Sequence, residues 1–359
     1  MKNLIGILYV CTLAVFVSCE DDENRNTGTP PASVLDVSAE AGPGEVILKW
    51  KNPDDPNLKY VNIAYINSQS EKVSINVSTY AVDSVTGFVT DTIDGFTDTK
   101  EYTFDLTARN LSGASSDAVQ IVKAPLAPVY HSIYSTITAK SDFGGVIVSW
   151  DNTLGKKAFV VALYPNPDNP SEKLLRRFDA TRSGSGYVSA GLNITAIDLE
   201  LYATDKYHNE SEKKNVRVEV YAETEFNKSE WSVPGYVDNS QNETIGYSSQ
   251  ATNEGASPNG RVIAIFDKNL ATFWHARWGS PATNYPHWYI IDLGKEVTIS
   301  RVEMARRQGN SQGQKGQQFL TCTAAGAANP ADPTTWAWED QGSYSFDAAT
   351  NNVQSYRLL

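Results

Sequence analysis

An internal repeat constrains the fold of this chain more than any other feature of the sequence. The segment GEVILKWKN (Gly44–Asn52) recurs as GGVIVSWDN (Gly144–Asn152), and Trp50 of the first copy matches Trp150 of the second. Apolar and polar residues alternate before each tryptophan, which is the period of a β-strand with one buried face. The repeat therefore predicts two similar β-units in tandem, each with its tryptophan in the core.

A second pair of matching segments lies later in each unit. YTFDLTARNLSGASS (Tyr102–Ser116) and IDLELYATDKYHNES (Ile197–Ser211) both contain an alternating strand, then an alanine, a polar turn and a serine. The strand number and the turn spacing are typical of immunoglobulin-like sandwiches. Tyr102 is predicted to be a core residue. Neither unit shows a catalytic or binding pattern, so both are expected to be spacers.

Three segments of the first unit carry a resemblance to a known family. They are the opening stretch PASVLDVSAEAGPGEVILKWKNPDD, the strand LKYVNIAY, and Tyr102 with the strand that follows it. Together they resemble a fibronectin type III domain, with Tyr102 as its corner tyrosine. The second unit is a looser match, in which LYPNPDNPSEK (Leu163–Lys173) is expected to be a proline-rich loop. The resemblance implies domains at residues 33–126 and 127–228.

The N-terminus has the pattern of an export signal. A short basic start precedes the apolar run LIGILYVCTLAVFV, which is too short to span a bilayer comfortably. Residues 1–18 are therefore expected to be a signal peptide. The SC pair that ends it resembles a bacterial lipobox, with Cys19 as the lipidated residue; the alternative is an ordinary signal with a coincidental cysteine. The acidic, then Pro/Gly/Thr-rich residues 19–32 are expected to be a tether.

The acidic run after Cys19 resembles the surface-export signal of Bacteroidetes lipoproteins, in which similar tandem units precede glycan-binding modules. This resemblance implies a lipid-anchored protein of the outer membrane that is exposed on the cell surface. With Cys11 in the signal and Cys19 lipidated, Cys322 is the one cysteine left. An intramolecular disulfide and a cysteine-rich metal cluster are therefore excluded. The net charge of −12 argues against nucleic acid as a partner.

Residues 229–245 are expected to be a polar linker, and a third domain is expected at 246–359. Its anchors are Asp267-x-Asn269-x-x-Thr272-x-Trp274, then WYIIDLG (Trp288–Gly294), then VTISRVEMARRQG. In this order they resemble the discoidin, or coagulation factor V/VIII type C, family, which implies a galactose-binding-like jelly-roll sandwich. The family has one more strand after SYRLL, so the domain is expected to be truncated here. The predicted fold class is all-β throughout.

Local patterns add two expectations for the third domain. WYIIDLGKEVTISRVEMA predicts two strands broken by a turn at Gly294. RQGNSQGQKGQQ (Arg307–Gln318) has three glycines among amides and predicts a long exposed loop. Trp274 stands at the family's buried tryptophan position and is expected in the core. Long loops at one end of a rigid sandwich are where binding residues usually lie.

The resemblance also implies a structural calcium ion at the Asp-Lys-Asn turn. Asp267, Asn269 and Thr272 would be its ligands, because calcium takes six to eight oxygens from a tightly curled polar loop. Lys268 stands where the family commonly has glycine, and no matching glutamate is found near the end of the domain. A metal-free Asx-turn is therefore the equal alternative. No organic cofactor is expected.

The residues after Trp274 are candidates for a glycan site. A sugar needs an aromatic face for the apolar side of its ring and polar groups for its hydroxyls. Trp278 or Tyr285 would supply the face. The polar candidates share a loop position near these aromatics: His275, Arg277, Arg306, Arg307 and Asn310. The alternative is that WHARW and YPHW pack on each other as a stiffened loop.

The sequence thus predicts a non-catalytic, carbohydrate-binding lipoprotein that captures polysaccharide, with possible protein partners in a polysaccharide-uptake system. The alternative is an adhesion or scaffold protein whose discoidin-like domain binds a protein. An enzyme is disfavoured because glycoside hydrolysis needs two facing carboxylates, and RRQGNSQGQKGQQ has none. The four histidines, at positions 131, 208, 275 and 287, lack zinc spacing.

Overall fold

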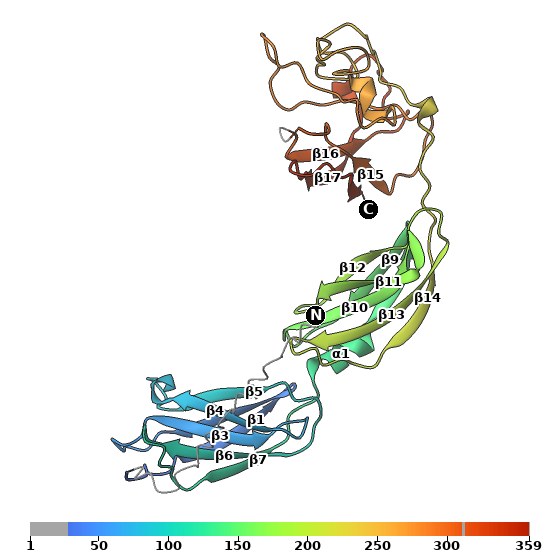
Figure 1. Cartoon of the computed structure of the whole chain (residues 1–359). Coiled ribbons are helices and arrows are strands. Elements are labelled where there is room, and N and C mark those ends of the chain that lie inside the picture. Colours follow the sequence, from blue (N-terminus) through green and yellow to red (C-terminus); the bar gives the residue numbers. More distant parts are fainter. Residues whose placement is uncertain (1–27, 311–312, 359) are drawn as a thin grey trace, which may run out of the picture.

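The computed structural model describes residues 28–310 and 313–358. The signal peptide at 1–18, Cys19 and most of the tether at 19–32 lie outside the described residues. Three β-rich units follow one another along the chain (Figure 1). Among the described residues, no helix has the length and the apolar composition needed to cross a membrane.

The first unit is a sandwich of a three-stranded and a four-stranded sheet. The sheets have the orders β1-β2-β5 and β4-β3-β6-β7, and every pair of neighbours is antiparallel. The strands are β1 (Leu35–Gly42), β2 (Glu45–Lys51), β3 (Tyr60–Ile66), β4 (Lys72–Ser78), β5 (Val89–Asp94), β6 (Tyr102–Arg109) and β7 (Val119–Lys123), with the short 3-10 helix η1 (Thr79–Ala81) after β4.

The core of the first unit contains the residues that the repeat predicted. Trp50 is fully buried, and Tyr102 is buried at the start of β6. The Tyr102 hydroxyl donates to Asp98 Oδ1 at 2.8 Å and lies 2.9 Å from Ser68 Oγ. The ring therefore packs in the core while its polar end is satisfied at the corner before β6.

The second unit repeats this topology. Its sheets have the orders β12-β9-β8 and β11-β10-β13-β14. The strands are β8 (Thr138–Asp142), β9 (Gly145–Trp150), β10 (Ala158–Asn166), β11 (Asn169–Asp179), β12 (Gly184–Ser189), β13 (Ala196–Asp205) and β14 (Lys214–Glu219). The repeated sequence segments form equivalent strands, β2 and β9, and Trp150 is buried in the second core as predicted.

Two features of the second unit differ from the sequence expectation. A helix, α1 (Val129–Thr136), precedes β8 and buries Val129, Tyr130 and Ile133 against the core. The predicted proline-rich loop at Leu163–Lys173 is wrong, because β10 and β11 extend through it as a hairpin. Proline is tolerated there because β11 is an edge strand and Pro165 lies beyond the β10–β13 pairing.

The third unit has less regular structure. Its strands form two two-stranded sheets, β15-β18 and β16-β17. The elements are η2 (Lys228–Glu230), η3 (Val262–Phe266), β15 (Arg301–Met304), β16 (Gly316–Thr321), η4 (Pro333–Thr335), β17 (Glu339–Ser345) and β18 (Gln354–Arg357). The fold class is all-β, as predicted, with multiple sheets in sandwich arrangements.

Several local expectations for the third unit need correction. The segment Trp288–Gly294 is no continuous strand: it makes isolated bridges, Tyr289 with Tyr247 and Asp292 with Ser232. The expected loop at Arg307–Gln318 ends early, because Gly316–Gln318 pair with β17 in β16. Trp274 is half-buried and packs on a core cluster that includes Tyr247.

The expected linker at 229–245 packs on the third unit. Val233 is buried in the same cluster as Tyr247 and Val262. The fully buried Gln250 side chain donates from Nε2 to the carbonyl oxygens of residues 237, 238 and 240, at 2.9, 3.1 and 2.9 Å. These buried hydrogen bonds hold the segment in place, so it acts as part of the third unit.

Candidate functional site

Trp278 and Arg307 meet on a residue that the sequence did not suggest, Glu254. Trp278 Nε1 donates to Glu254 Oε1 at 2.7 Å, and Arg307 Nη1 lies 3.4 Å from Glu254 Oε2. The Arg307 guanidinium also stacks over Phe273, at 3.7 Å from the ring centroid. The indole remains 59% exposed. Glu254 therefore holds an exposed aromatic face and a cation beside each other.

A second aromatic group involves His275, Tyr285 and His287. The Tyr285 and His287 rings lie 4.5 Å apart at 52°, and Tyr285 is 88% exposed. Burial, with a smaller contribution from the charge of His275, lowers the pKa of His287. The His287 ring is therefore held neutral near pH 7, when one ring nitrogen accepts and the other donates.

Backbone contacts fix the loop that carries these residues. Gly260 pairs with Trp274 in a bridge, and the His275 carbonyl accepts from the Ala251 amide at 2.8 Å. Trp274 Nε1 donates to the Ser249 carbonyl at 3.0 Å, and the Arg277 amide donates to Ser249 Oγ at 3.1 Å. Trp278 and Tyr285 are thus exposed side chains on an anchored loop.

The remaining predicted site residues contact three different parts of the third unit. Arg277 Nη1 donates to Asn242 Oδ1 at 2.8 Å, and Asn310 donates its amide to the Arg307 carbonyl at 3.3 Å. Arg306 turns away: its Nε donates to the Thr350 carbonyl at 2.6 Å and its Nη2 to Asn351 Oδ1 at 2.7 Å. Arg306 thus joins a neighbouring loop and is separate from the Glu254 contacts.

The predicted calcium turn is held by its own hydrogen bonds. Asp267 Oδ1 accepts from the Asn269 amide at 2.8 Å, and Asp267 Oδ2 accepts from Thr272 Oγ1 at 2.6 Å. The Thr272 hydroxyl also lies 2.7 Å from the Asn269 carbonyl. The turn gathers side-chain and carbonyl oxygens but contains one carboxylate. Among the described residues, no group of three or more His, Cys, Asp or Glu side chains is arranged to hold a metal.

Comparisons with known proteins divide the chain into three stretches. Two domains of unknown function match it, DUF4959 at residues 31–125 and DUF5126 at 126–229. The F5/8 type C domain matches residues 244–321. The third unit is similar to that domain. This match agrees with the discoidin-like anchors in the sequence.

Two curated proteins share a short stretch with this chain. A sialidase of Micromonospora viridifaciens is 36% identical over 84 residues, which is 23% of this chain and 12% of the sialidase. A lacto-N-biosidase of Bifidobacterium bifidum is 35% identical over 92 residues, which is 25% of this chain and 8% of that protein. The likeness therefore covers a small part of either relative.

Solved structures with two or three fibronectin type III domains also match. A two-domain segment of chicken tenascin aligns at 14% identity and a TM-score of 0.25, over 52% of this chain and 99% of the segment. Domains FN1–FN3 of chicken CNTN1 align at 13% identity and a TM-score of 0.23, over 53% of this chain and 69% of that structure.

Proposed function

We propose that this chain is a non-catalytic carbohydrate-binding protein of a bacterial cell surface that captures polysaccharide. The proposal rests on the exposed Trp278 face held beside Arg307 by Glu254. An exposed indole can pack on the apolar face of a sugar ring, while a guanidinium and a carboxylate bond its hydroxyls. Similarity to the F5/8 type C domain and to stretches of two enzymes with glycan-related names supports this choice of ligand.

The proposed site consists of Trp278, Glu254 and Arg307. We include Arg277 and Tyr285, on the segment that carries Trp278, and Asn310, whose amide donates to the Arg307 carbonyl. The described contacts around Trp278 include a single carboxylate, that of Glu254. Glycoside hydrolysis by the usual route needs two carboxylates across the scissile bond.

A glycan array followed by calorimetry tests the proposal. We expect the Trp278→Ala protein to bind about tenfold or more weakly to the glycans that the unchanged protein binds on the array. The substitution removes both the stacking surface and the hydrogen bond that positions Glu254. Tyr80→Ala is the matched control, since Tyr80 is 95% exposed on the first unit. If the folded Trp278→Ala and unchanged proteins bind the glycans equally, the proposed site is wrong.

A second candidate function is adhesion through a protein partner. The exposed Tyr285 favours it, because tyrosine and tryptophan are enriched at protein interfaces. If the folded chain binds no glycan on the array, and a surface protein binds it in a Tyr285-dependent manner, adhesion replaces carbohydrate capture.

The surface location forms part of the proposal. Cys19 would carry the lipid, and residues 20–32 would hold the sandwiches away from the outer membrane. Clustering on a membrane raises avidity for a repeating ligand even when each site is weak. Labelling cells with a fatty-acid analogue should mark the unchanged protein and leave the Cys19→Ser protein unmarked. Equal labelling of the two proteins would contradict lipidation at Cys19.

A further inference from the structure

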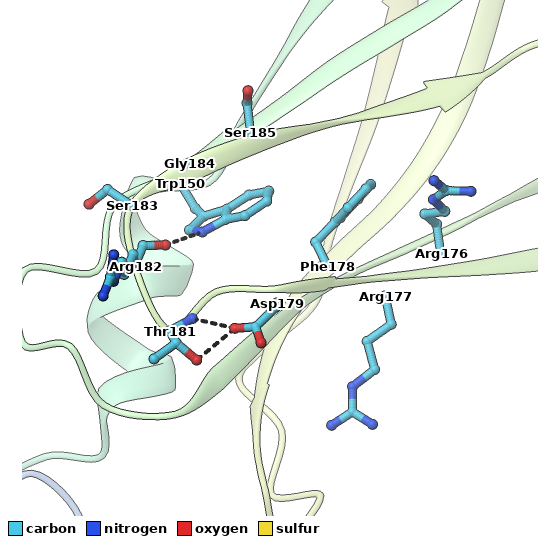
Figure 2. A pocket seen from close by; sticks show the side chains of 10 residues that line it. All are labelled: Trp150, Arg176, Arg177, Phe178, Asp179, Thr181, Arg182, Ser183, Gly184 and Ser185. Carbon is cyan, nitrogen blue, oxygen red and sulfur yellow. Dashed lines mark hydrogen bonds between the residues drawn. The ribbon is translucent and has the colours of Figure 1, made fainter. Parts of the chain in front are cut away.

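The second unit has an open cleft at one edge of its sandwich. The strands β11 and β12 are the edge strands of its two sheets, and the cleft lies where β11 ends and β12 begins (Figure 2). Its volume is about 640 Å³. That lies within the range of about 300 to 1,000 Å³ that is usual for small-molecule sites.

Two stacked aromatic rings form one wall of the cleft. Trp150 and Phe178 lie 5.5 Å apart between centroids, at 27°. The Trp150 indole is fixed because its Nε1 donates to the Arg182 carbonyl at 2.9 Å. Phe178 is half-buried at the end of β11. Trp150 is buried in the core, and the partly buried Phe178 ring supplies the exposed part of this wall.

Glycines in the RSGSG segment keep space beside these rings. A Cβ at Gly186 would lie 2.2 Å from the Phe178 ring, so a side chain there would displace the phenyl group. A Cβ at Gly184 would touch the Trp150 indole at 3.5 Å. Glycine at these two positions lets the start of β12 pack closely against both rings.

The rim of the cleft carries unpaired positive charge. Arg176 lies on the same side of β11 as Phe178, with its guanidinium 5.8 Å from that ring, and Arg182 lies at the opposite end (Figure 2). Neither arginine forms an ion pair within residues 28–310 and 313–358. The one carboxylate that lines the cleft, Asp179, is bonded to Thr181 at 2.9 and 2.6 Å and paired with Lys157.

Arg177 lies on the other side of β11 and stacks on Phe159, at 3.5 Å from the ring centroid (Figure 2). Two guanidinium groups without ion-pair partners, beside the exposed part of Phe178, favour a ligand with an apolar ring face and an attached anion. Arginine binds carboxylates through two parallel hydrogen bonds.

We propose that this cleft is a second binding site, which takes a carboxylate-bearing sugar residue of an acidic polysaccharide. The sugar ring packs on the exposed part of Phe178, and its carboxylate bonds Arg176 or Arg182. The need for a ring and an anion comes from the cleft itself. The choice of a saccharide rests on the proposed carbohydrate-binding function, although this site is separate from Trp278.

Calorimetry on residues 20–359 tests the proposal with a short oligogalacturonate and with the same oligosaccharide after chemical reduction of its carboxyl groups. We expect the acidic form to bind and the reduced form to bind at least about tenfold more weakly, because a charge-assisted hydrogen bond is lost. Either Arg176→Gln or Arg182→Gln, whichever removes the arginine that holds the carboxylate, should weaken binding of the acidic form about tenfold.

Arg217→Gln is the matched control, since Arg217 is an exposed arginine on β14 of the same unit and is paired with Asp198. It should leave the affinity unchanged. The proposal is overturned if the unchanged protein binds neither form, if the two forms bind equally, or if Arg176→Gln and Arg182→Gln behave like Arg217→Gln.

The Trp278→Ala protein separates this proposal from the proposed function. It should retain oligogalacturonate binding at the cleft while losing the glycans of the third unit. If Trp278→Ala abolishes oligogalacturonate binding and neither Arg176→Gln nor Arg182→Gln has an effect, the acidic ligand binds to the third unit. That result would contradict the proposed second site.

Discussion

At the scale of single residues, Glu254 does the most to organise the candidate site. The Glu254 side chain is 17% exposed and lies in neither a strand nor a helix. It nevertheless contacts both Trp278 and Arg307, which come from different parts of the third unit. Its neighbours in the sequence, TNEGASPNG, have the composition of an ordinary turn. A turn glutamate gives no local sign of such a role, because its two partners are brought to it only by the fold.

Calcium at the Asp267 turn is also a question for single residues. If calcium binds there, about 5 mM CaCl2, which exceeds the dissociation constants of ~0.1–1 mM of weak extracellular sites, should raise the melting temperature relative to EDTA. The shift should disappear in the Asp267→Asn protein, which keeps an acceptor for the Asn269 amide and removes the charge. Differential scanning calorimetry measures both.

The same melting temperature with calcium and with EDTA in the unchanged protein would instead identify a metal-free Asx-turn. In that case the hydrogen bonds of Asp267 with Asn269 and Thr272 are sufficient to hold the turn.

At the scale of elements, the two copies of the repeat share a turn that needs glycine. Gly44 and Gly144 precede β2 and β9 with φ values of 65° and 61°. The left-handed region disfavours residues with a Cβ. In the second unit the space is also filled, because a Cβ on Gly144 would lie 2.3 Å from a carboxylate oxygen of Glu223.

Gly144→Ala should therefore lower the free energy of unfolding of the second unit by more than the ~1–2 kcal/mol expected from backbone strain alone. Gly155→Ala is the control: its φ is 64°, and nothing lies within 4 Å of an added Cβ. Urea unfolding of both proteins measures the difference. Equal losses would mean that Glu223 moves aside without cost.

At the scale of the whole molecule, ion pairs connect successive units. Lys156 of the second unit lies 2.7 Å from Glu45 of the first. At the next junction, Arg301 of the third unit lies 2.9 Å from the buried Glu223, and Arg357 Nη2 lies 2.7 Å from Asp142. The β15–β18 sheet is thus bonded to the end of the second unit (Figure 1).

Arg357→Ala should loosen the second junction. Besides the pair with Asp142, the substitution removes a bond to the Phe143 carbonyl at 3.1 Å and a contact with the Tyr187 ring at 3.8 Å. Small-angle X-ray scattering should show a broader distribution of intramolecular distances. Arg217→Ala, which removes an exposed pair inside one unit, should leave the scattering unchanged. Identical curves for all three proteins would show that Arg357 does not set the orientation.

The sequence alone determined the features that depend on local pattern. The alternation around Trp50 and Trp150 and the strand that begins at Tyr102 predicted two tandem sandwiches, since period-two burial is a property of the strand itself. The anchors from Asp267 to Trp274 predicted the similarity of the third unit to F5/8 type C domains. The candidate aromatics Trp278 and Tyr285 also came from the sequence, and both are exposed.

Only the tertiary structure decided which side chains meet. It placed Glu254 on Arg307, 53 residues away, and turned Arg306 toward Asn351. It also placed Phe178 of β11 against Trp150 of β9, beside the cleft. A strand pattern specifies which face is buried but not which strand stands at an edge. Contacts between distant segments follow from the packing of whole sheets, so a local sequence pattern does not predict them.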